Sequence, residues 1–340
     1  MRNHEITKPT PLLDEYGRLT QPGWARKPFF TYDRKAIKTS KLRIKEWDYY
    51  IVMSDNFGLA LTVSDIGYIA LMSVSLLDFT QPWEITNTVI KPLPLGKLKM
   101  PPSPEEGNVY FRDKNLTIEY TVSPGKRWLK CEHKKFSEGK TLTCDVELTQ
   151  PEIDSLVIAT PWAEDEKAFY YNQKFNCMPA KGFVNFDGKD YVFNPQKDFG
   201  TLDWGRGVWT YDNTWYWGSG NGLVEGKPFG FNIGYGFGNT AAASENILFY
   251  EGRGHKLDDV SFNIPPDSYT KPWTFSSSDG RFEMDFLPVI DRYARTSALV
   301  ISTEQHQVFG KMSGKAVLDD GRVLEVKDLL CFAEDVHNRY

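Results

Sequence analysis

The sequence predicts an all-β protein built from two packed antiparallel barrels or sandwiches, with few short helices. Three observations support this: many segments alternate between apolar and polar residues, tight-turn dipeptides separate them, and helix signals are sparse. At 340 residues the chain is about twice the usual domain size, so two barrels fit better than one. Closure of each sheet into a barrel would remove exposed strand edges.

The alternation is clear in residues 115–122, where Leu116, Ile118 and Tyr120 are separated by polar residues. Such a run turns one face toward the core and the other toward water, as antiparallel strands do. Dipeptides that favour the positive φ angles of tight hairpin turns separate several runs. They are Glu138-Gly139, Asp187-Gly188, Asp279-Gly280 and Asp320-Gly321.

These patterns predict a nearly continuous series of strands. In the first half we expect them at 47–54, 57–64, 67–76, 83–90, 108–112, 115–122, 126–132 and 141–149. In the second half we expect them at 181–186, 189–194, 207–217, 229–237, 245–251, 272–276, 281–289, 297–303, 305–318 and 321–330. The one clear helix signal is a short segment at 33–38, for which Asp33 would be the N-terminal cap.

The domain boundary is expected near residue 165, which gives an N-terminal barrel at 1–165 and a C-terminal barrel at 166–340. The alternation weakens between residues 151 and 181, where two prolines and an acidic cluster at 164–166 interrupt it. A second proline-rich stretch at 92–104 is expected to form a long loop within the first domain.

Composition narrows the functional classes. Charged residues make up 25% of the chain and the net charge is −5, so nothing favours nucleic-acid binding. The N-terminal residues lack the apolar core of a secretory signal, and no stretch is apolar enough to cross a bilayer as a helix. The four cysteines are scattered, as expected for buried, reduced thiols. We therefore expect a cytoplasmic protein.

Several strings carry a family resemblance: Gly23-Trp24-Ala25-Arg26, Lys45-Glu46-Trp47-Asp48-Tyr49-Tyr50, Asp203-Trp204-Gly205-Arg206-Gly207 and Phe332-Ala333-Glu334-Asp335-Val336-His337-Asn338-Arg339. Over essentially its whole length the chain resembles the bacterial domain of unknown function family 2804 (DUF2804). That family is remotely similar to tandem lipocalin-like proteins such as carotenoid hydratases, tocopherol cyclases and lipocalin-like Diels–Alderases. The resemblance implies two lipocalin-like barrels, but it transfers no catalytic residue.

The segment 203–246 is the densest in unusual residues, because four of the ten tryptophans lie within fourteen positions. A small-molecule pocket needs apolar walls with a few converging polar groups, and a barrel interior can supply both. We select Asp203 and Glu245 as candidate catalytic acids. The candidate substrate-binding residues are Trp204, Arg206, Trp209, Trp217, Asn232, Tyr235 and Asn246.

A structural interpretation of the same residues competes with the functional one. Asp203 and Arg206 flank a Trp-Gly pair and could simply form an ion pair at a strand end, with the tryptophans filling the core. Glu245 enters a strand beside apolar residues, where its pKa could rise, or it faces solvent at the strand start. His337 could act as a proton shuttle, or Glu334 and Arg339 could close the barrel end.

No motif requires a cofactor, and five well-separated histidines argue against a metal site. Glycine-rich stretches at 218–222 and 234–238 lack the context of phosphate-binding loops. The segment Arg26–Lys45 carries eight basic residues against one acidic residue, which suggests either a peripheral membrane contact or a solvated face.

Three functions fit the sequence, and it leaves open whether the protein is an enzyme at all. The first is binding of a hydrophobic or amphipathic small molecule with proton-transfer chemistry, such as hydration, cyclisation or isomerisation. The second is a carbohydrate-active enzyme that uses tryptophan platforms and paired carboxylates. The third is a non-catalytic lipid carrier or binding module. All three depend on a hollow interior in the second barrel.

Overall fold

Two large antiparallel sheets dominate the computed structural model, which describes residues 2–298 and 301–339. The prediction of an all-β chain with few short helices is confirmed, because the helical segments of the described residues are two single turns, η1 (Arg34–Ala36) and η2 (Lys41–Arg43). No helix in this part of the chain has the length and apolar character needed to span a membrane.

The first sheet has thirteen strands, and the path through it runs β7-β6-β5-β4-β15-β13-β11-β10-β9-β8. Strands β12 and β14 pair with β13, and β2 pairs with β12. The strands are β2 (Gly23–Ala25), β4 (Ile44–Met53), β5 (Phe57–Asp65), β6 (Ile69–Asp78), β7 (Trp83–Pro92), β8 (Val109–Arg112), β9 (Leu116–Ser123), β10 (Lys126–Ser137), β11 (Lys140–Thr149), β12 (Leu156–Pro161), β13 (Phe169–Phe186), β14 (Lys189–Phe193) and β15 (Phe199–Val208). A separate pair, β1 (Thr10–Pro11) and β3 (Phe30–Thr31), lies near the N-terminus.

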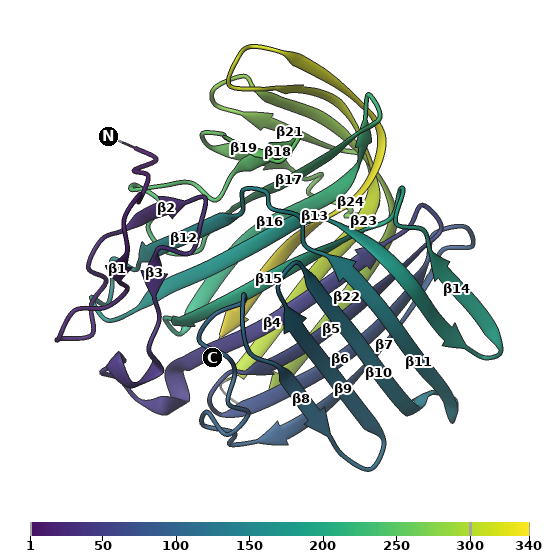
Figure 1. Cartoon of the computed structure of the whole chain (residues 1–340), viewed down its shortest axis with the longest axis horizontal. Helices are drawn as coiled ribbons and strands as arrows, with labels where there is room; N and C mark the ends of the chain where they lie inside the picture. Colours follow the sequence, from purple (N-terminus) through teal and green to yellow (C-terminus); the bar gives the residue numbers. More distant parts are fainter. Residues whose placement is uncertain (1, 299–300, 340) are drawn as a thin grey trace.

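The second sheet has nine strands in the order β19-β18-β17-β16-β24-β23-β22-β21-β20. Its strands are β16 (Asp212–Val224), β17 (Lys227–Tyr235), β18 (Ile247–Tyr250), β19 (Arg253–Lys256), β20 (Val260–Asn263), β21 (Trp273–Ser277), β22 (Phe282–Ala298), β23 (Ile301–Val317) and β24 (Val323–Arg339). Figure 1 shows that both sheets curl strongly and that β16 and β24 of the second lie near β4, β13 and β15 of the first.

Three apolar cores follow from this arrangement. One fills the inside of the first curled sheet and includes Tyr50, Leu129 and Trp204. A second fills the inside of the other sheet and includes Phe231 and Trp273. The third contains residues of both sheets, and it forms the layer where their outer faces pack together. We call this third core the inter-sheet layer.

The middle strands of the first sheet are buried on both faces. Every residue of β15 is buried, as are the first ten of β13, because the barrel interior covers one face and the second sheet covers the other. Alternation between apolar and polar residues vanishes in such strands. That is why β12, most of β13 and most of β15 were missing from the predicted strands, and why the predicted strand 207–217 spans the gap between β15 and β16.

The chain passes from the first sheet to the second between Val208 and Asp212, so β13 to β15 belong with the earlier strands. The domain division at residue 165 concerns independent folding units and stays a prediction. Another predicted strand, 297–303, includes two positions outside the described residues, and the strands on either side of them form one long hairpin, β22–β23.

Local signals were more dependable. Asp33 caps η1 by accepting a hydrogen bond from the Lys35 amide. Positive φ angles occur at all four of the predicted hairpin dipeptides. The four cysteines are buried and free, as expected. In the basic segment, however, Arg26, Arg34 and Arg43 form ion pairs within the protein and Lys45 is buried, so less of its charge reaches the surface than the sequence implies.

Candidate active site between the two sheets

A group of ionisable side chains lies in the inter-sheet layer, where apolar contacts would be expected. Strand alternation points Asp203 of β15 and Lys174 of β13 out of the first barrel. Glu334 of β24 points toward them from the second sheet, and Glu245, just before β18, completes the group. All four residues are at least 93% buried, with exposed fractions of 7%, 1%, 5% and 1%. Buried charges are costly unless they are paired or functional.

Asp203 is the best-satisfied member of the group. Its carboxylate accepts hydrogen bonds from Lys174 Nζ at 2.9 Å and Asn172 Nδ2 at 2.5 Å on one oxygen, and from Trp47 Nε1 at 3.1 Å on the other. The Lys174 ammonium also lies 4.1 Å from the centre of the Trp217 ring. An ion pair and a cation–π contact therefore fix the Lys174 side chain in its buried position.

Glu334 is held by neutral donors. One of its oxygens accepts from Trp215 Nε1 at 3.4 Å, and the other accepts from Gln305 Nε2 and Gln307 Nε2, each at 3.2 Å. Burial raises the pKa of Glu334 to about 7, and the negative charge of Asp203 adds to the increase. A carboxyl group with such a pKa can both donate and accept a proton near neutral pH, which ordinary glutamates cannot.

Glu245 keeps one oxygen without a partner. Tyr170 donates a hydrogen bond to Oε1 at 2.7 Å, whereas the buried Oε2 has no protein partner. Burial raises the pKa of this carboxyl as well, Asp203 raises it further, and Lys174 opposes the change. Asn232 links this part of the site to the indoles, since it donates to the Glu245 carbonyl and accepts from Trp217 Nε1, both at 2.7 Å.

Aromatic rings surround this polar group. Trp209 packs edge to face against Trp47 at 5.6 Å and against Trp215 at 5.1 Å between ring centres. Tyr170 stacks on Phe237 at 4.8 Å. Trp47 and Trp215 are only partly buried, so they form the exposed side of this aromatic cluster. Gly205 makes room for the first of these indoles, because a Cβ atom there would lie 1.9 Å from Trp47 Cζ2.

The structure brings some predicted site residues together and separates others. Asp203, Glu245, Trp209, Trp217 and Asn232 lie in or beside the inter-sheet site. Asn246 supports it, because its side chain accepts a hydrogen bond from the Gly234 amide at 2.7 Å.

Trp204 and Arg206 lie on the opposite face of β15, inside the first barrel. The anticipated ion pair between Asp203 and Arg206 is therefore wrong, because residues 203–206 form continuous strand and positions of opposite parity face opposite ways. Arg206 pairs with Asp48 at 3.0 Å instead.

The inner face of the second sheet holds neither candidate acid. Its core is packed with aromatic side chains of the sheet itself, and Tyr235 stacks on Tyr216 at 4.7 Å at the edge of that core. His337 is partly exposed and bonds to Asp212 at 2.8 Å. The prediction of a hollow second barrel that holds the acids is therefore wrong, because apolar side chains pack its interior and the acids meet behind it, between the sheets.

Sequence reasoning missed Lys174, Tyr170 and Gln307 and gave Glu334 only a structural role. A signal for Glu334 existed in the sequence. It directly follows the apolar run Leu329–Ala333, and a lone carboxylate is unexpected at the end of a run that forms a buried strand. The other three lie on strands that the alternation pattern either hid or assigned to a barrel surface. No group of three or more His, Cys, Asp or Glu residues suited to a metal ion occurs in residues 2–298 and 301–339.

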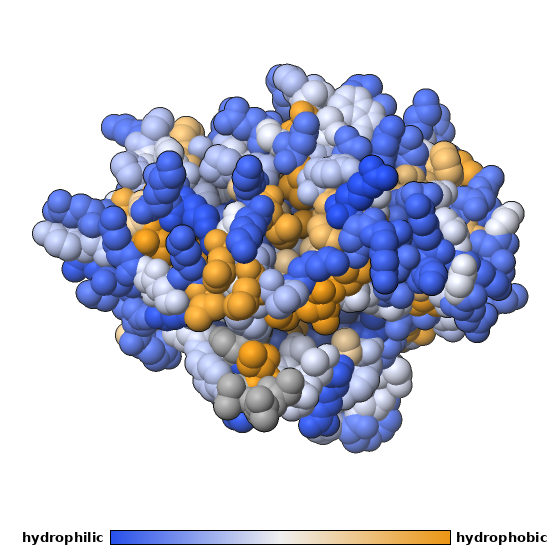
Figure 2. Space-filling view, turned by 90° about the horizontal axis from the view of Figure 1, so that it is seen from below, coloured by the Kyte–Doolittle hydropathy of each residue, from blue (hydrophilic) through white to orange (hydrophobic). Residues whose placement is uncertain are grey.

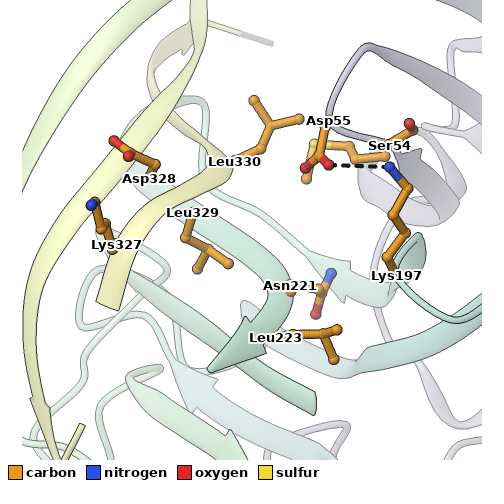
Figure 3. A pocket seen from close by; sticks show the side chains of 11 residues that line it. Ser54, Asp55, Lys197, Asn221, Leu223, Lys327, Asp328, Leu329 and Leu330 are labelled. Atoms are coloured by element: carbon orange, nitrogen blue, oxygen red, sulfur yellow. Dashed lines mark hydrogen bonds and ion pairs between the residues drawn. The ribbon is translucent and has the colours of Figure 1, made fainter. Parts of the chain in front are cut away.

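A pocket of about 210 Å³ opens at another part of the same layer. Met53 and Leu330, which line it, also belong to the inter-sheet core, so pocket and acid group share one layer. Figure 3 shows Asp55 and Lys197 paired at one side of this opening, with their charged atoms 3.4 Å apart, and Lys327 and Asp328 on the opposite side. A second pocket, of about 320 Å³, lies near the N-terminus and is lined by residues between Pro9 and Ala36.

Comparison with known proteins identifies the fold. The family model described as a domain of unknown function (DUF2804) matches residues 3–340. A search of curated proteins finds no match. Among solved structures, CghA with Sch210972 aligns over 99% of this chain and 97% of its own, with a TM-score of 0.56 and 11% identity.

Two further structures align along most of the chain. A putative ATTH from Nitrosomonas europaea aligns over 91% of this chain and 98% of its own, with a TM-score of 0.51 and 13% identity. Kievitone hydratase from Nectria haematococca aligns over 91% of this chain and 95% of its own, with a TM-score of 0.48 and 8% identity. The predicted architecture of two tandem lipocalin-like barrels is confirmed.

Proposed function

The chain belongs to DUF2804, and we propose that it binds a small amphipathic molecule between its two sheets and transfers a proton to or from it. The reaction class would be hydration, cyclisation or isomerisation, which needs a positioned acid or base and no cofactor. Glu334 is the proposed proton donor and acceptor. Asp203 and Glu245, selected from the sequence, take supporting roles in this proposal.

One observation carries the proposal: three carboxyl groups and one lysine are buried together in the inter-sheet layer, beside its apolar core. Architecture alone gives no reason for this, because apolar residues would join two sheets at lower cost. Perturbed carboxyl groups in such surroundings cluster at functional sites. Glu334, with a pKa raised by burial to about 7, exists in both protonation states near neutral pH.

The remaining groups suggest how a ligand would be held. Buried acceptors without partners, Glu245 Oε2, Asn172 Oδ1 and Asn176 Oδ1, would receive hydrogen bonds from hydroxyl groups of the ligand. The faces of Trp47 and Trp215 would cover its apolar part and stabilise positive charge that develops on protonation. An apolar patch ringed by polar residues on the face shown in Figure 2 also suits an amphipathic molecule.

The comparisons agree with this proposal without establishing it. CghA, which shares the fold, was solved with Sch210972. The carbohydrate alternative has less support, because Trp204, Trp209 and Trp217, the indoles selected as platforms from the sequence, are at least 95% buried and pack against other rings.

The test uses the full chain with a panel of prenyl alcohols, hydroxylated polyenes and oligosaccharides. Binding is followed by quenching of tryptophan fluorescence, and turnover in D₂O is followed by mass spectrometry. We expect a bound prenyl alcohol or polyene to gain deuterium, and Glu334→Gln to keep binding within about threefold while losing ~10²-fold or more in rate. Glu325→Gln, at an exposed glutamate, is the matched control.

Other outcomes would contradict the proposal in different ways. Binding without turnover of any compound would support a carrier. Turnover unchanged in Glu334→Gln would remove Glu334 as the acid. Hydrolysis of an oligosaccharide would favour the carbohydrate alternative.

A further inference from the structure

A second polar centre, separate from the inter-sheet site, lies inside the first barrel around Arg127 of β10. This arginine is 1% exposed. Its Nε donates to Gln150 Oε1 at 2.8 Å and its Nη1 donates to Tyr50 Oη at 3.2 Å. The guanidinium also lies 4.9 Å from the centre of the Phe175 ring. All of these contacts are with neutral groups.

Other arginines of this barrel have counter-ions. The buried Arg206 pairs with Asp48 at 3.0 Å, and the partly buried Arg34 pairs with Glu46. Within the described part of the chain, no carboxylate forms an ion pair with Arg127. A guanidinium cannot lose its proton in a protein, so it cannot escape the cost of burial by becoming neutral. A buried charge of this kind normally needs an anion beside it.

Unpartnered groups in the barrel interior also point to a missing acceptor. Arg127 Nη2, Arg206 Nε, Trp204 Nε1 and Tyr120 Oη are buried and have no hydrogen-bond partner in the protein. Each of them can donate a hydrogen bond, and a carboxylate among them would be an acceptor for more than one.

The loop between β7 and β8 lies at this end of the barrel. Arg206 Nη2 donates to the Pro101 carbonyl of that loop at 2.8 Å. Glu105, further along the loop, is exposed, yet its pKa is raised by partial burial and lowered by the charge of Arg127. The charges of Arg127 and of this exposed loop residue thus act on each other.

We propose that Arg127 binds the carboxylate of a small amphipathic acid inside the first barrel. One carboxylate oxygen would accept from Nη2, and the apolar core around it would receive the hydrocarbon part. The ion pair would give Arg127 a carboxylate in direct contact, whereas Asp48 and Glu105 act on it only from a distance. This inference does not depend on the proposed function, since Arg127 and Glu334 lie in different cores.

The experiment measures the melting temperature and calorimetric affinity of the full chain with four probes. Octanoate is compared with 1-octanol and octyltrimethylammonium, which have the same chain but no negative charge, and with acetate, which has the charge but no chain. We expect octanoate alone to bind and stabilise measurably. Acetate binding as tightly as octanoate would mean a simple anion site, and 1-octanol binding as tightly would overturn the proposal.

Variants locate the site. Arg127→Met should weaken octanoate binding ~10-fold or more and should itself raise the melting temperature without ligand, because an uncompensated buried charge is removed. Lys126→Met, at the exposed neighbouring position, is the matched control and should change neither.

Two further variants separate the possible failures. Glu105→Gln should strengthen octanoate binding, because it removes a competing negative charge, and it tests the site even where Arg127→Met does not fold. Undiminished binding in Arg127→Met would overturn the proposal. Glu334→Gln should bind octanoate like the parent; loss of binding there would place octanoate in the inter-sheet site instead.

Discussion

Glu334→Gln should change how the stability of the protein depends on pH. The raised pKa means that the folded protein holds a proton on Glu334 between the ordinary value of 4.5 and about 7, where the unfolded chain has lost it. This group therefore contributes stability at low pH, and the contribution is lost as pH rises through that window. With a factor of ~1.4 kcal/mol per pH unit, the loss between pH 5 and pH 8 is about 2 to 3 kcal/mol.

Glutamine has nearly the same shape and cannot ionise, so the variant should lack this loss. The free energy of unfolding is measured by urea titration at pH 5, 6.5 and 8. Between pH 5 and pH 8 it should fall by about 2 to 3 kcal/mol more in the parent than in the variant. Glu325→Gln, at an exposed site, should show no such difference. Parallel pH profiles for parent and Glu334→Gln would refute the assignment of a raised pKa to this carboxyl, and with it the proposed proton donor.

Two substitutions test the packing of the inter-sheet layer. Lys174→Met should destabilise the fold by about 3 to 5 kcal/mol in denaturant titrations, because it leaves Asp203 buried without its cation. The control is Lys130→Met, which removes an exposed ion pair and should cost at most about 1 kcal/mol. Gly205→Ala should cost about 3 kcal/mol and shift the tryptophan emission spectrum, because the added Cβ would overlap the Trp47 indole. The control is Gly58→Ala, whose Cβ would lie 3.3 Å from its nearest neighbouring atom, and it should cost about 1 kcal/mol or less. Equal effects within either pair would contradict the contacts described.

The strands could be predicted from the sequence where one face of the strand is exposed to solvent. In β9 and β11 the apolar and polar residues alternate, and the burial of their side chains alternates in the same way. The alternation carries no information where both faces are covered. Strand β15 is such a case, because the contact between the two sheets, which no local pattern encodes, buries its second face.

The sequence identified only part of the candidate site, because contacts between distant strands are also not encoded by local patterns. Asp203 and Glu245 stood out because they are acids in an aromatic-rich segment. Their partners Lys174 and Glu334 come from strands far away in the sequence, and they meet Asp203 only because β13 pairs with β15 and the second sheet packs across both. Arg206 shows the opposite error, since closeness in sequence suggested an ion pair that strand alternation forbids.

The packing of two barrels against each other gives this chain an interior that neither barrel has alone. Each barrel fills its own interior largely with apolar residues, and the buried charged groups lie in two different places. Carboxyl groups gather between the sheets, around Asp203 and Glu334, whereas Arg127, inside the first barrel, forms no ion pair within the described residues. Polar residues with a purely structural role would have their hydrogen bonds satisfied within the protein. Buried acids in one place and an arginine without an ion pair in the other are instead what two separate ligand sites require.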